Sequence, residues 1–84
     1  MLVIQRLQTR YTLDGEIHTA DTLIEQVDIQ GEPHFRALLE GTPLHETFGG
    51  TASSVELALD FLNLAMQAEG AGEIHTIDFQ DQHQ

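Results

Sequence analysis

Cysteine is absent from this chain of 84 residues, and so is lysine. Without cysteine the chain can form no disulfide framework, no thiolate nucleophile and no cysteine-ligated metal site. Long hydrophobic runs are also missing, because Asp60 and Asn63 interrupt the most apolar stretch, and we expect no membrane span. The apolar residues 1–4 are followed at once by Gln5 and Arg6, which is too short for a signal peptide. These absences predict a cytoplasmic protein.

Positive charge is scarce. Three arginines face 14 acidic residues, for a formal net charge of −11. Such a surface repels nucleic-acid phosphates and anionic membranes, so we expect no direct contact with either. It would attract a basic protein, or imitate a phosphate backbone to one. The plainer interpretation, that acidity only maintains solubility, stays open.

The length of the chain allows one domain, which we place at residues 1–79, followed by a disordered tail at 80–84. A chain of this size buries only about 60–65% of the surface that its unfolded form exposes. We therefore expect modest stability, which self-association would raise.

The first half of the chain has the period-two pattern of β-strands. Apolar and polar residues alternate over 2–13, and Asp14-Gly15 forms the turn to a second strand. A two-residue type I′ loop would set Tyr11 opposite His18, whereas a three-residue bulged loop would set Tyr11 opposite Ile17. The bulged register collects more apolar side chains on one face: Leu7, Tyr11, Ile17, Leu23, Val27 and Ile29. Hydrophobic matching therefore predicts the bulged loop.

Residues 20–27 could form a short helix, but their alternation favours a long bent strand over 16–29. Further strands are expected at 34–40, 44–48 and 73–79, with turns at the two prolines. The predicted fold is α+β: an antiparallel meander of three to four strands, one long helix packed on one face, and a final short strand, in the order ββββαβ.

The helix predicted at 52–69 begins with a capping box, Ser53 to Glu56, and ends at Gly70. Its polar residues form one narrow stripe, so the apolar arc spans roughly 220°, about twice the width that a one-sided surface helix needs. We infer that a second copy or another protein covers one flank. The candidate interface residues are Leu57, Phe61 and Leu64 on one flank, and Val55, Leu59 and Met66 on the other.

A short repeat offers an alternative. Gly15-Glu16-Ile17-His18-Thr19 recurs as Gly72-Glu73-Ile74-His75-Thr76. Glutamate and histidine two apart on a strand point the same way. If the two strands were neighbours, the four candidate ligands could bind zinc or another divalent metal: Glu16, His18, Glu73 and His75.

Catalytic residues are harder to find. Ser53 and Ser54 are explained by helix capping, and no local pattern pairs either serine with a base. We expect neither an enzyme nor a cofactor. The sequence predicts a small acidic interaction or regulatory module, either homodimeric or bound to another, possibly basic, protein.

Overall fold

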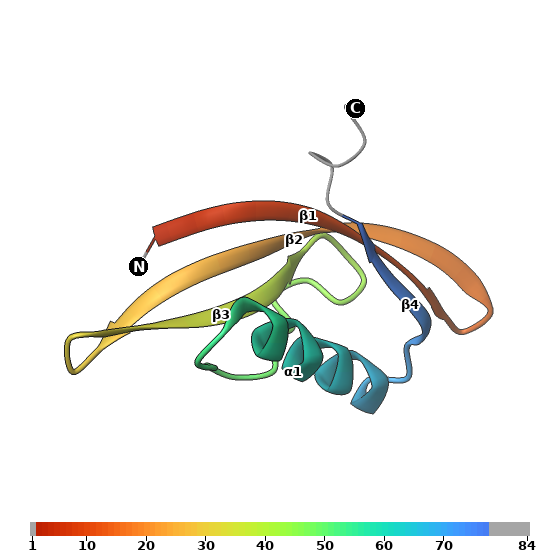
Figure 1. The fold of residues 1–84 in the computed structure, drawn as a ribbon. Helices are drawn as coiled ribbons and strands as arrows, with labels where there is room; N and C mark the ends of the chain where they lie inside the picture. The colour runs from red at the N-terminus through yellow and green to blue at the C-terminus, as the bar shows by residue number, and fades with distance from the viewer. Residues whose placement is uncertain (1, 78–84) are drawn as a thin grey trace.

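The structure is a computed structural model that describes residues 2–77, and it has the order βββαβ. The elements are β1 (Leu2–Leu13), β2 (Glu16–Ile29), β3 (Glu32–Glu40), α1 (Val55–Ala68) and β4 (Gly72–Ile77). The strands form one antiparallel sheet in the order β3-β2-β1-β4, which curls over α1 (Figure 1). The predicted α+β class is confirmed. The predicted tail at 80–84 and the end of the strand predicted over 73–79 lie outside the described residues.

The β1–β2 hairpin does not have the predicted bulged loop. Leu13 pairs with Glu16 and Tyr11 with His18, so the loop has two residues. Asp14 (φ 53°) and Gly15 (φ 80°) both have the positive φ that a type I′ turn requires.

Both faces of β2 are in part covered, and this explains the wrong register. Ala20 and Ile24 fill the face that α1 covers, and Leu23 is buried on the other face, opposite Arg6. Ile17, which the bulged register would have turned inward, is 70% exposed. Counting apolar residues on one face of the hairpin therefore favoured the bulged loop, which is the wrong register.

The long bent strand expected over 16–29 is confirmed as β2, and β3 carries Phe35, Ala37 and Leu39 on one face as expected. The strand expected over 44–48 is wrong. Glu46 has a left-handed φ of 69°, and the Thr47 N–H donates to the Leu44 carbonyl, so this segment turns.

The loop after β3 nevertheless covers the outer edge of that strand. The Leu39 N–H donates to the Thr47 carbonyl at 3.0 Å, and Phe35 exchanges two backbone hydrogen bonds with Ala52. Leu44 is buried as predicted, whereas Phe48 is half exposed. Covering the edge satisfies backbone groups that would otherwise be open to pairing.

Helix α1 begins one residue later than the predicted capping box. Ser54, not Ser53, is the N-cap, and its hydroxyl accepts from the Leu57 N–H at 3.1 Å. Glu56 still lies in the first turn, where a carboxylate favours the positive end of the helix dipole.

The end of α1 is as predicted. Gly70 takes a φ of 97°, its N–H donates to the Gln67 carbonyl, and the Ala71 N–H donates to the Met66 carbonyl, both at 3.0 Å. This pair of bonds is a Schellman motif, and it satisfies carbonyls that the last turn leaves free. It also turns the chain directly into β4.

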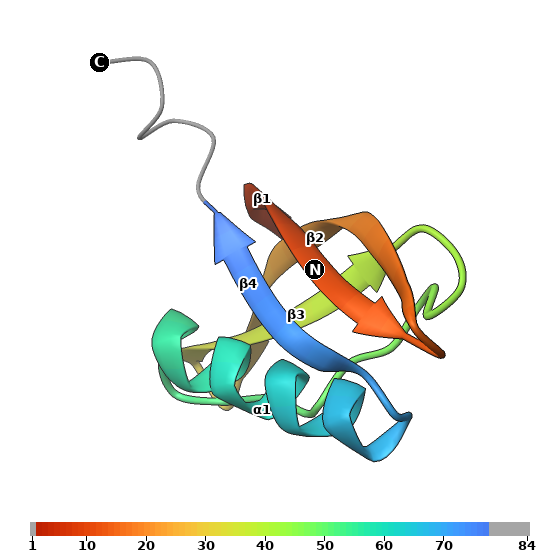
Figure 2. The same cartoon turned by 90° about the vertical axis from the view of Figure 1, so that its right-hand side faces the viewer.

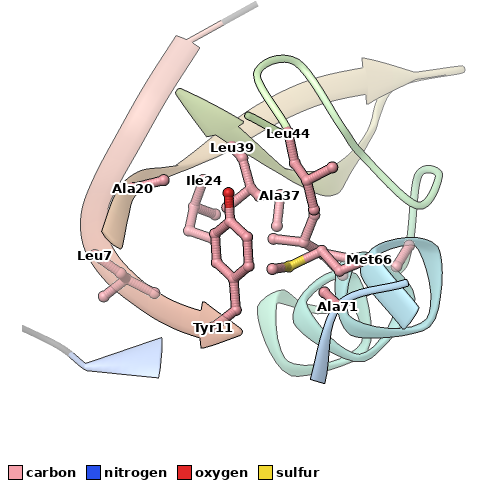
Figure 3. Packing of buried hydrophobic residues seen from close by; sticks show 12 residues of the cluster. Leu7, Tyr11, Ala20, Ile24, Ala37, Leu39, Leu44, Met66 and Ala71 are labelled. Atoms are coloured by element: carbon pink, nitrogen blue, oxygen red, sulfur yellow. The ribbon is translucent and has the colours of Figure 1, made fainter. Parts of the chain in front are cut away.

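The core lies between the sheet and α1. Figure 3 shows the Tyr11 ring among Ile24, Leu39, Leu44 and Met66. Gly49 brings the loop against the helix backbone, because a Cβ at this residue would lie 2.0 Å from the Phe61 carbonyl oxygen. The loop can pass this close to α1 only with glycine at position 49.

Candidate interaction surface

One stripe of residues along α1 is buried in the core. Ala58, Leu62 and Met66 are 0%, 2% and 0% exposed, and Val55 and Leu59 pack beside them. These positions recur every three or four residues, as one face of a helix does. The stripe is thus the surface by which α1 holds the sheet.

The opposite side of α1 is uncovered and carries apolar side chains beside the exposed Asp60 and Gln67. Leu64 is 62% exposed and Leu57 37% exposed, although both are on a helix that already supplies much of the core. Phe61 lies between them, is partly buried and packs against the core, with Gly50 beside its ring. We call Leu57, Phe61 and Leu64 the outer flank of α1. Sequence reasoning offered this flank as one of two candidates, and the structure leaves Leu57 and Leu64 accessible.

The other predicted flank does not offer a surface. Met66 is fully buried inside the subunit, and Val55 and Leu59 are partly buried against the same core. Rotation of α1 toward these residues is what leaves Leu57 and Leu64 outside. Met66 is therefore excluded as a contact residue for a partner.

Two shallow depressions border the outer flank. One, of about 360 Å³, is lined by Asp60, Asn63, Leu64 and Gln67. The other, of about 520 Å³, lies between α1 and β4 and is lined by Asn63, Gln67, Ala71, Gly72, Glu73 and Ile74. The Gln67 side-chain amide donates to the Asn63 Oδ1 at 2.6 Å, so the ridge between the depressions is ordered and polar. The outer flank thus continues into a hollow beside β4.

The four candidate metal ligands are not brought together. Strand β1 lies between β2, which carries Glu16 and His18, and β4, which carries Glu73 and His75. His18 lies opposite Tyr11 on β1 and His75 opposite Arg10, so the two imidazoles are on opposite faces of the sheet. Within residues 2–77 no group of three His, Asp or Glu side chains could bind a metal ion. The repeated Glu-x-His pairs are separate.

Tyr11 is the one buried group whose chemistry is perturbed in the described part of the chain. Its ring is 0% exposed and lies 5.6 Å from the His18 ring. Burial raises the pKa of the Tyr11 phenol, and the nearby Leu44 backbone lowers it in part. The hydroxyl forms no well-aligned hydrogen bond with any described residue. The hydroxyl points into the core (Figure 3), and Tyr11 also borders a depression of about 180 Å³ that is lined with it by Arg10, Thr12, Ile17, Glu73 and His75.

Sequence reasoning missed a second apolar feature, on the far side of β3. Phe48 is half exposed, and the Arg36 guanidinium lies 5.6 Å above its ring. The Arg36 Nε also donates to Glu25 Oε1 at 2.7 Å, which fixes the guanidinium. Phe48 was expected to point inward from a strand. The left-handed turn at Glu46 interrupts that strand, and the Phe48 side chain is half exposed instead.

Comparison with protein-family models, with curated proteins and with solved structures finds no match to this chain. Over residues 2–77, no helix has the length and apolar character needed to cross a membrane.

Proposed function

We propose that this protein is a small, non-enzymatic, cytoplasmic interaction module that associates with a second copy of itself through the outer flank of α1. The observation that carries the proposal is the 62% exposure of Leu64 on a helix whose other side is fully buried. Leu57, 37% exposed, lies about two turns before Leu64 on the same side, and the partly buried Phe61 lies between them. Surface helices of this length normally keep such positions polar.

The energetic gain from covering this flank is appreciable for so small a chain. Full burial of a leucine side chain is worth about 1.5–3 kcal/mol, so the uncovered part of Leu64 represents about 1–2 kcal/mol in each subunit. A two-fold interface buries this residue from both subunits, so the gain is about 2–4 kcal/mol, which corresponds to about a thirtyfold to thousandfold change in the dissociation constant.

Net charge distinguishes a second copy from a basic partner. Two copies, each with a charge of −11, repel one another, and added salt screens that repulsion. Self-association should therefore tighten as ionic strength rises. A complex with a basic protein should weaken under the same change.

The proposal is tested by Leu64→Gln, examined by sedimentation equilibrium. The substitution removes apolar surface from the outer flank without entering the core, so we expect an intact fold and loss of the dimer. Leu2→Gln is the matched control, because Leu2 is 63% exposed at the start of β1, away from α1 (Figure 1). An unchanged dissociation constant in Leu64→Gln would refute the assignment of this flank.

A further inference from the structure

The two edges of the sheet are treated differently. The edge of β3 is hydrogen bonded to the loop that follows it, at Thr47 and Ala52. Figure 2 shows β4 as the outermost strand on the other side. Strand β4 pairs with β1 along one edge, and no described residue pairs with the other edge. An uncovered edge presents unpaired N–H and C=O groups to any extended chain.

The free edge of β4 adjoins the surface already proposed to associate. The 520 Å³ depression runs between α1 and the first half of β4, and it shares Asn63 and Gln67 with the depression that contains Leu64. A partner that covers Leu64 would therefore extend over this edge. The lining is polar, as suits a strand bound through its backbone.

We propose that the partner at this edge is the β4 strand of a second copy, paired antiparallel about Ile74. This inference rests on the proposed self-association, and it specifies which strands of the two copies pair. In this register Ile74 faces Ile74 of the partner subunit, and Glu73 faces His75 of the partner subunit. The four-stranded sheet then continues into that of the second copy.

The charges on β4 are self-complementary in this register. Within one subunit Arg10 on β1 lies directly opposite His75 on β4. The second copy would place Glu73 of the partner subunit on the far side of His75. Glu73 lies at a bulge, where the β1–β4 register shifts and its own φ is 47°, so it is the irregular end of a row of arginine, histidine and glutamate across three strands spaced roughly 4.8 Å apart. The two-fold axis generates the same row a second time.

The side chains of Arg10 and Glu73 are available for this row of charges. Arg10 and Glu73 are both exposed, and neither forms an ion pair with another described residue. Arg6, by contrast, lies 3.5 Å from Glu40 and 4.0 Å from Asp21. Opposite charges directly across a strand pair stabilise it, and like charges destabilise it. Other registers of the pair place no histidine directly opposite Glu73.

The test is His75→Glu, measured by sedimentation equilibrium on the full chain. This substitution places a carboxylate against Glu73 at both ends of the pair, and we expect the dissociation constant to rise about tenfold. The exchange variant Glu73→His/His75→Glu keeps the net charge of the wild type and again sets an imidazole opposite a carboxylate. We expect it to restore the wild-type constant. Histidine also tolerates the left-handed φ of 47° at position 73.

His34→Glu is the control for net charge, because His34 lies on β3 at the opposite edge of the sheet. Equal dissociation constants for His75→Glu and His34→Glu would overturn the strand pairing, as would failure of the exchange variant to recover. If Leu64→Gln still dissociates the dimer in that case, the proposed function stands without this geometry. If the wild type is monomeric throughout, both fail together.

Discussion

Gly49→Ala is the substitution for which the structure gives the clearest expected loss of stability. A Cβ at position 49 would lie 2.0 Å from the Phe61 carbonyl oxygen, 2.1 Å from its carbon and 2.7 Å from the Leu62 nitrogen. All three are helix backbone atoms, so no side-chain rotation relieves the clash. The loop would have to move away from α1 by more than 1 Å to reach van der Waals contact.

This movement would uncover the side of α1 that includes Phe61 and Leu62. Inserting a carbon into a packed core typically costs about 1–3 kcal/mol, and backbone neighbours place this site at the upper end, about 3 kcal/mol. For a domain of this size that loss lowers the melting temperature by roughly 12–24 °C. Urea unfolding followed by circular dichroism measures the free energy directly.

Gly72→Ala is the control for Gly49→Ala. Its Cβ would meet only the Thr12 hydroxyl, at 3.3 Å, and that side chain can rotate. We expect a loss below about 1 kcal/mol. Equal stability of Gly49→Ala and the wild type, within about 0.5 kcal/mol, would show that the loop does not hold α1 as described.

Two further predictions concern single groups in the fold. Ser54→Ala should cost about 1 kcal/mol in urea unfolding because it removes the N-cap acceptor, whereas Ser53→Ala should leave stability unchanged; the reverse order would support the capping box that the sequence suggested. Tyr11→Phe removes a buried hydroxyl without a described partner, so stability should stay constant or rise by up to about 2 kcal/mol. Because burial raises the pKa of the Tyr11 phenol, the folded state retains a proton that the unfolded state loses, and stability should fall as pH rises above about 10. A pH titration of the melting temperature should show a smaller alkaline fall in Tyr11→Phe; an identical fall would contradict this origin.

The helix and its ends could be predicted because their signals are local. The narrow polar stripe of α1 and the glycine at position 70 act within a few residues of themselves, and both appear in the structure as expected. The same local pattern offered two flanks of the helix as possible contacts and did not choose between them. Which flank the core would cover has no signal in the helix sequence, because it depends on residues that other elements pack against α1.

The failures all required knowledge of neighbours in space. The hairpin register depended on Leu23 being buried on the second face of β2, which a count on one face could not show. The two Glu-x-His pairs are similar in sequence, but β1 lies between their strands. Leu44 and Phe48 have the spacing of a strand, and the left-handed backbone at Glu46 separates them. A local sequence pattern predicts a helix or strand and its apolar face. Which side chains come into contact depends on strand order and loop conformation.

The molar mass of the wild-type chain, measured by sedimentation equilibrium from low to high micromolar concentration at low and high salt, tests the central claim most directly. The account predicts a monomer–dimer equilibrium around the chain mass of 9.3 kDa that shifts toward the dimer as salt screens the acidic surface. A mass that stays at that of one chain at every concentration and both salt levels would contradict it.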